Sequence, residues 1–145
     1  MDLSGVVLSA LRKRAVPLTS LTYCILFKGY GRAGDVARVR KLHSAIMKMR
    51  SVELDLPTYN AWLDALARNG DLRTAEAVLA QMPTQGVMPS VRSYNILIHG
   101  HGHKGRLRDA FGMVAKLRKE LGPSAPNDVT YSTLVHAVRC AWSSQ

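Results

Sequence analysis

A tyrosine in a similar setting recurs along the chain at nearly constant intervals. Four such tyrosines are spaced 36, 35 and 37 residues apart, namely Tyr23, Tyr59, Tyr94 and Tyr131. A glycine stands eleven residues after each of the first three, namely Gly34, Gly70 and Gly105. A fixed internal period of this length is typical of proteins built from stacked structural units. The period therefore predicts a repeat protein.

Each period contains the pattern of two helices. Apolar residues follow the tyrosines at the i, i+3, i+4 and i+7 positions that form one face of an α-helix, as in Tyr59, Trp62, Leu63 and Leu66. The glycine suits the left-handed residue that ends this helix, and Asp35 or Asp71 suits the N-cap of a second one. Such hairpins bury their apolar faces only by stacking, so the sequence predicts an all-α solenoid.

The period divides the chain into three full and two partial repeats. The predicted units are the tail of a preceding repeat, three repeats and the first helix of a further one, at 3–19, 20–55, 56–90, 91–127 and 128–145. Trp62, Met82, Met113 and the four tyrosines lie on the apolar stripes and are predicted to be core residues. Partial repeats leave apolar helix faces uncovered at both ends. We therefore expect a longer native chain or a packing partner.

The charge of the chain is strongly basic and uneven. The 145 residues carry a net charge of +10, with 20 basic and 10 acidic side chains. The basic surplus lies in residues 1–50 and 101–145, while residues 51–100 are slightly acidic. A polyanion such as RNA, or an anionic membrane surface, is a reasonable partner for such a chain. No apolar run approaches the roughly 20 residues that cross a bilayer, so membrane insertion is not expected.

Several other classes of site find no support in the sequence. Cys24 and Cys140 are far apart and form no CxxC motif, which predicts buried thiols and neither a disulfide framework nor a zinc module. The stretch HGHGHKG, residues 99–105, places three histidines close together but lacks nearby further ligands for a metal. It aligns with the end of a first helix, where small residues let helices approach closely and His101 is packed. No pair of carboxylates or activated nucleophile predicts an enzyme, a cofactor or a small-molecule substrate.

The repeat motif resembles one known family. Residues 57–90, PTYNAWLDALARNGDLRTAEAVLAQMPTQGVMPS, are similar almost throughout to the pentatricopeptide repeat, and the resemblance covers essentially the whole chain. The tetratricopeptide repeat has a comparable period, but its Trp, Leu, Gly, Tyr pattern is not found here. The resemblance implies a right-handed superhelix that binds single-stranded RNA, one base per repeat, in a mitochondrion or chloroplast. It also implies a part in RNA processing, stabilisation or translation.

The resemblance also implies which residues face the bases. These are the residue after each tyrosine and the last residue of the repeat. The resulting candidates are Asn60 with Ser90, Asn95 with Asn127, Cys24 with Asp55, and Ser132. The two asparagine pairs resemble pyrimidine-reading pairs, cytosine for the first and cytosine or uracil for the second. An asparagine amide also has the donor and acceptor that a pyrimidine edge requires, although Asn60 and Asn95 suit a structural role at helix starts as well.

Two further sets of residues are implied to contact the RNA. The wedges between successive bases would be the residues two before the tyrosines, namely Leu21, Pro57, Arg92 and Val129. Pro57 is equally typical of a helix start. Phosphate contacts would come from the ends of the first helices, at Lys28, Arg32, Arg68 and His103, which are also compatible with solvated helix ends.

A structural function is the alternative to sequence reading. The first and last candidate pairs depart from the family pattern, and the basic runs at 10–14 and 38–43 belong to second helices on the outer layer. A structural or adaptor subunit of an organellar ribosome, or of another large assembly, would hold protein or RNA without reading bases. Both hypotheses allow RNA binding and differ in its specificity.

Overall fold

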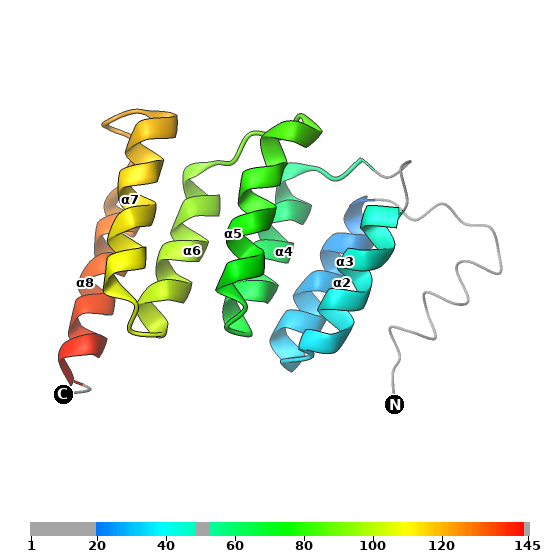
Figure 1. Ribbon diagram of the computed structural model, residues 1–145, viewed down its shortest axis with the longest axis horizontal. Coiled ribbons are helices and arrows are strands. Elements are labelled where there is room, and N and C mark those ends of the chain that lie inside the picture. The colour runs from blue at the N-terminus through cyan, green and yellow to red at the C-terminus, as the bar shows by residue number, and fades with distance from the viewer. Residues whose placement is uncertain (1–19, 49–52, 144–145) are drawn as a thin grey trace.

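The computed structural model describes residues 20–48 and 53–143, and these residues are helical and contain no strand (Figure 1). The α-helices are α2 (Ser20–Ala33), α3 (Val36–Lys48), α4 (Leu56–Arg68), α5 (Leu72–Gln81), α6 (Val91–His103), α7 (Leu107–Leu121) and α8 (Asp128–Ser143). A short 3-10 helix, η1 (Met82–Gln85), extends α5. The predicted all-α fold is confirmed, while the predicted tail at 3–19 and the basic run at 10–14 lie outside the described residues.

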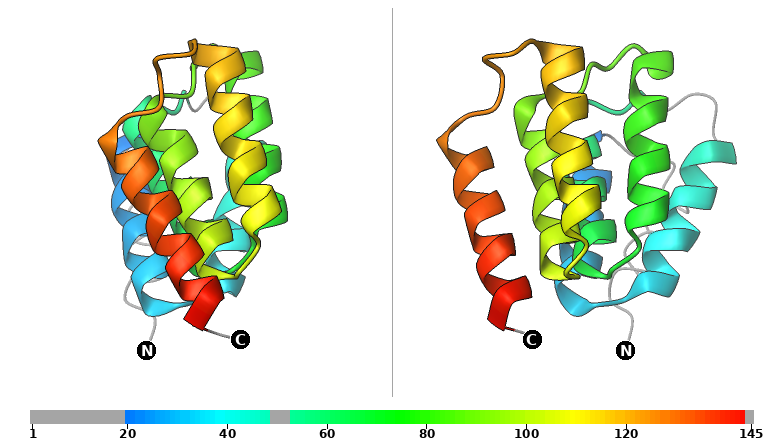
Figure 2. Two further views of the ribbon diagram at one scale, coloured as in Figure 1. Left: turned by 90° about the vertical axis from the view of Figure 1, so that its left-hand side faces the viewer. Right: turned by 60° about the vertical axis from the view of Figure 1, so that its left-hand side comes forward.

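The helices form two layers of a solenoid. Helices α2, α4, α6 and α8 lie in one layer, each in contact with the next, and α3, α5 and α7 form the second layer (Figure 2). We call α2, α4, α6 and α8 the first helices. The apolar core fills the space between the layers, because both helices of each pair turn their apolar stripes towards it. No helix in the part of the chain that the structure describes is long and apolar enough to cross a membrane.

The turns within the helix pairs have the predicted chemistry. Gly34, Gly70 and Gly105 have φ angles of 72°, 77° and 73°, a conformation that other residues adopt only with strain. Asp71 accepts a hydrogen bond from Thr74 N and caps α5. Asp35 accepts one from Arg38 N at 3.1 Å at the start of α3. Glycine and aspartate therefore reverse the chain in the same way in the first two pairs.

The core confirms most of the predicted buried residues. Trp62 is 2% exposed and stacks on Phe27 and Tyr59, with ring centroids 5.2 and 5.9 Å away. Met82, Met113 and the first three repeat tyrosines are also buried.

Two predictions of burial in the C-terminal helix are wrong. Tyr131 is 49% exposed, because its face of α8 receives no second helix among the described residues. Its counterparts Tyr59 and Tyr94 are covered by such a helix. Of the two cysteines, Cys24 is buried as predicted, whereas Cys140, near the end of α8, is only partly buried.

Small residues set the spacing of the first helices, as the sequence predicts. A methyl group added to Gly31 would lie 2.9 Å from both Cα and Cβ of Ala65. A methyl group on Gly102 would overlap Ala137 Cβ in the same way, between α6 and α8. The backbones of neighbouring first helices therefore approach within a distance that a larger residue would prevent.

Candidate nucleic-acid interface

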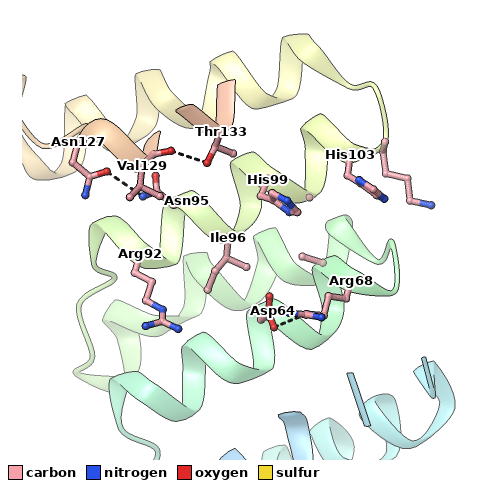
Figure 3. Close-up of a pocket in the computed structure, with 13 residues that line it drawn as sticks. Asp64, Arg68, Arg92, Asn95, Ile96, His99, His103, Asn127, Val129 and Thr133 are labelled. Carbon is pink, nitrogen blue, oxygen red and sulfur yellow. Dashed lines mark hydrogen bonds and ion pairs between the residues drawn. The ribbon is translucent and has the colours of Figure 1, made fainter. Parts of the chain in front are cut away.

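An open hollow of about 750 Å³ lies on the layer of first helices (Figure 3). Its lining comes from α4, α6, the start of α8 and the adjoining turns. We call it the first-helix hollow, and it is lined by Asp64, Ala67, Arg68, Arg92, Asn95, Ile96, His99, Gly100, His103, Lys104, Asn127, Val129 and Thr133. Six residues that the sequence assigned to RNA contacts meet in it, namely Arg68, Arg92, Asn95, His103, Asn127 and Val129.

Asn60 and Asn95 occupy equivalent positions at the joints between successive first helices. The Asn60 Oδ1 atom accepts a hydrogen bond from Ser93 Oγ at 2.6 Å, and Asn95 Oδ1 accepts one from Thr130 Oγ1 at 2.7 Å. Both asparagines are 9% exposed. They therefore have the structural role that the sequence left open, in which the carbonyl oxygen joins one repeat to the next.

The amide nitrogens of these asparagines have fewer partners. Asn60 Nδ2 donates to none of the residues that the structure describes, and Asn95 Nδ2 has a long bond of 3.4 Å to Asn127 Oδ1. Asn127 Oδ1 also accepts a hydrogen bond from Thr130 N in the first turn of α8. Because the carbonyl oxygens are engaged, the group that each asparagine offers to a ligand is a donor.

Ser90 is also engaged at a helix start. Its hydroxyl accepts from Ser93 N in a capping box at the start of α6. Ser93 is the residue that binds Asn60, so the predicted pair of Asn60 and Ser90 is linked through one hydroxyl group.

The remaining candidates for base contacts are placed differently. Asp55 caps α4 by accepting from Thr58 N, and its carboxylate also accepts from Ser20 Oγ at 2.9 Å. The hydrogen bond from the Thr58 hydroxyl, at 2.6 Å from Asp55 Oδ1, holds the Asp55 pKa below its usual range. The Cys24 thiol is 4.0 Å from Pro57 O, so its contact at the joint is weak. Ser132 is exposed on α8. None of these three residues lines the first-helix hollow.

The four candidate wedge residues are exposed. Leu21 and Val129 keep 67% and 59% of their surface open, which is unusual for large apolar residues. Arg92 projects over the first-helix hollow, which Val129 also lines (Figure 3). Pro57 lies in the first turn of α4 after the Asp55 cap, the position typical of a helix-start proline.

The candidate phosphate contacts differ in charge from repeat to repeat. Lys28 and Arg32 are exposed on α2 and form no ion pair with the described residues. Arg68 donates from Nε to Asp64 Oδ2 at 2.8 Å, which offsets its charge. The equivalent pair on α6 is His99 and His103, whose rings stack with centroids 6.1 Å apart. Burial, followed by the electrostatic effects of His103 and His136, lowers the pKa of His99.

His101 has the packed position that the alignment predicts. It is 3% exposed, and its Nε2 atom lies 2.9 Å from Glu76 Oε1, away from the first-helix hollow. No group of three potential metal ligands occurs among the described residues.

The sequence prediction of RNA contacts missed several residues of the hollow, notably Asp64, Ile96, His99, Lys104 and Thr133. Asp64 and His99 precede Arg68 and His103 by one helical turn, so helical periodicity applied to the phosphate positions would have found them. Lys104 follows the end of α6, and its Nζ lies over Gly70 of the preceding turn. This contact links two repeats, and the equivalent residue of the preceding repeat, Asn69, likewise lies beside Gly34 of the turn before it.

The two layers of paired helices and the repeated joints define a helical-repeat solenoid. Models of the PPR repeat family match residues 54–103 and 89–139, and a model of the single PPR repeat matches residues 21–50. These matches cover more than half of the chain, so the chain belongs to the pentatricopeptide repeat family.

Curated relatives are longer proteins of the same family. A PPR5 homolog from Oryza sativa, named as chloroplastic, is 30% identical over 135 residues, covering 90% of this chain and 27% of the relative. Pentatricopeptide repeat-containing protein 1 from Rattus norvegicus, named as mitochondrial, is 31% identical over 94 residues, covering 64% and 13%. The chain thus spans about a quarter of the length of these relatives or less.

Solved structures show the same fold. The structure of PPR10 in complex with an 18-nt psaJ RNA element superposes with a TM-score of 0.80 at 24% identity, covering 97% of this chain and 20% of that one. The PPR domain of Arabidopsis thaliana protein-only RNase P 1, solved with tRNA, gives a TM-score of 0.73 at 17% identity. It covers 97% of this chain and 73% of that domain chain.

Proposed function

We propose that this protein binds single-stranded RNA along its first helices and acts in organellar RNA metabolism. The observation that supports the proposal most strongly is the first-helix hollow, where Arg92, His103 and Lys104 surround the amide groups of Asn95 and Asn127. The cations Arg92 and Lys104 suit phosphates, while amides beside the exposed Val129 suit unstacked bases. The structures of PPR10 with an 18-nt RNA element and of the protein-only RNase P 1 PPR domain with tRNA support RNA as the class of ligand.

Base preference at two repeats is the finer part of the proposal. Asn60 and Asn95 each present an Nδ2 donor to a base, and adjacent acceptors at N3 and O2 of cytosine, or the carbonyls of uracil, accept from such a donor. Asn127 beside Asn95 resembles the family's pyrimidine pairs. The relatives named as chloroplastic and mitochondrial support an organellar location.

A binding titration against mixed single-stranded RNA at low salt tests the proposal. Arg32→Gln should weaken binding to every sequence and flatten the salt dependence, because it removes an exposed charge from the first helices. Arg118→Gln is the matched control, since Arg118 is exposed on α7 in the outer layer. If no RNA binds, or if both variants weaken binding equally, the first helices are not the RNA-binding surface.

Selection from randomised RNA tests base reading. Asn95→Asp keeps the acceptor for Thr130 Oγ1 and replaces the amide donor, so the wild-type pyrimidine preference should be lost at one base position. Asn69→Asp, on the turn after α4 and outside the first-helix hollow, serves as the charge-matched control. A wild-type selection without any enrichment would contradict base reading.

The second candidate function is an adaptor that holds RNA or protein without reading sequence. The uncovered apolar face of α8 favours it, because Tyr131, Val135 and Trp142 are 49%, 58% and 80% exposed. Large exposed apolar patches mark interaction sites. RNA binding without enrichment in the selection is the outcome that this candidate predicts.

A further inference from the structure

Two positions one helical turn apart, near the ends of α2, α4 and α6, carry a different kind of charge in each of these helices. The pair on α2, Lys28 and Arg32, carries two permanent positive charges. The pair on α4 is an ion pair of Asp64 and Arg68 and is close to neutral. The pair on α6 consists of two histidines, whose charge depends on pH in the physiological range. Of these three pairs, only the α6 pair can gain charge when RNA arrives; the equivalent positions on α8 are His136 and Cys140.

We propose that His99 and His103 form a proton-coupled binding site for an RNA backbone phosphate. RNA binding then takes up protons and strengthens as the pH falls. This inference rests on the proposed RNA-binding function and adds a form of regulation to the same surface. Its ligand is a phosphodiester group, which both protonated rings can bind through N–H donors.

The geometry of the two rings supports this site. His99 and His103 are one helical turn apart on α6, both line the first-helix hollow, and their ring planes are nearly parallel at 10°. The two rings point into the hollow on the same side as Arg68 (Figure 3). Two stacked imidazoles repel each other when both are charged, and an anion between or beside them relieves that repulsion.

The neighbouring helices determine when the histidines are charged. From α4, Asp64 favours a positive charge on His99 and Arg68 opposes it. From α8, His136 opposes it, and His136 itself contacts Cys140 Sγ at 3.5 Å. On α5 and α7, Glu76 and Asp109 face His101 instead.

The surroundings of His99 in the free protein therefore disfavour its charged form. Burial and the neighbouring histidines lower the pKa of His99, while a bound phosphate would raise the pKa of each histidine that it contacts. The slope of log affinity against pH equals the number of protons taken up. Because proton uptake is only partial over most of this range, about a quarter to three quarters of a proton on average, we expect affinity to rise about 3- to 30-fold between about pH 7.5 and about pH 5.5.

Fluorescence anisotropy with labelled oligouridine at constant ionic strength measures this dependence. Uracil gains no proton in this range, and the dye should be insensitive to pH. The double variant His99→Gln, His103→Gln should lose most of the pH dependence. The matched control Lys28→Gln, Arg32→Gln should weaken binding at every pH and keep the wild-type slope, because its charges are permanent.

Histidine-ring NMR titration of the wild-type protein gives a readout that does not depend on a variant's folding. Addition of oligouridine should raise the pKa of His99 and His103. If oligouridine binds with no change in either pKa, or if the histidine variant keeps the full pH dependence, the proton-coupled site is wrong. If oligouridine does not bind at any pH, the proposed function itself fails, and the two failures are thus distinguishable.

Discussion

Replacement of Gly31 by alanine tests whether the contact between first helices sets the geometry of the solenoid. Gly31 lies in α2 and faces α4, where an added Cβ would lie 2.9 Å from both Cα and Cβ of Ala65. Gly29 lies in the same helix two residues earlier, and an added Cβ there meets nothing within 4 Å. The two substitutions are chemically identical and differ only in what the new methyl group meets.

The expected effects have opposite signs. Both substitutions gain helix propensity, about 1 kcal/mol for an alanine that replaces a glycine inside a helix. Gly31→Ala also overpacks a backbone contact, which typically costs about 1–3 kcal/mol. We therefore expect Gly29→Ala to raise the free energy of unfolding by up to about 1 kcal/mol and Gly31→Ala to lower it by up to about 2 kcal/mol. The difference of about 1–3 kcal/mol between the variants measures the packing cost alone.

Urea unfolding followed by circular dichroism measures both variants. A third variant, Gly31→Ala with Ala65→Gly, removes the Cβ contact but leaves the contact with Cα, so it should relieve the packing cost only in part. If Gly31→Ala is as stable as Gly29→Ala, the close approach of α2 and α4 is not a constraint on the fold, and the packing argument is refuted.

Three further predictions concern single side chains. Trp62→Ala should lower the free energy of unfolding by about 3–5 kcal/mol, because it empties a buried site. Trp62→Phe should lower it clearly less, because the buried indole N–H that it removes has no acceptor among the described residues. Thermal unfolding compares the two variants. Asp55→Ala should lower the free energy of unfolding by about 1 kcal/mol, because α4 loses its N-cap. Asp55→Asn keeps an acceptor and should lower it less. Urea unfolding measures both variants. Burial lowers the pKa of His43, so the unfolded chain binds more protons below about pH 6.5. The melting temperature should therefore fall as the pH drops below that value, and less steeply in His43→Gln; equal slopes would contradict this account.

The stability of the protein also depends on pH through Asp55, which is charged when it stabilises the fold. Its pKa is held below the usual range by the hydrogen bond from Thr58, so its contribution to stability is complete at neutral pH. That contribution begins to be lost as the pH falls below about 4, because the carboxylate is then protonated in the unfolded chain before it is protonated in the folded protein. The loss is complete once the pH has fallen below the lower pKa of the folded state. Stability measured at neutral pH thus includes the whole effect of the cap.

The helix pairs could be predicted from the sequence because their determinants are local. Gly70 and Asp71 define a turn whatever surrounds them, and the spacing of Trp62 and Leu66 defines one helix face. The close contact at Gly31 was predictable for a similar reason, since glycine and alanine recur at matching positions in the period.

Contacts between repeats give polar groups partners that the period alone does not reveal. The sequence offered Asn60 and Asn95 either a base-reading or a structural role, and the structure shows their carbonyl oxygens bound to Ser93 and Thr130 of the following repeat. The charge of Arg68, a predicted phosphate contact, is offset by Asp64, which the sequence did not assign to the RNA-binding surface.

The sequence by itself determined an all-α solenoid of helix pairs, because its period, turn residues and apolar stripes act within each repeat. The tertiary structure decided which polar atoms remain available to a ligand and which apolar faces remain open, as on α8 at Tyr131. The physical reason is that hydrogen bonding and burial depend on residues about one repeat away, which are brought together only when the repeats stack.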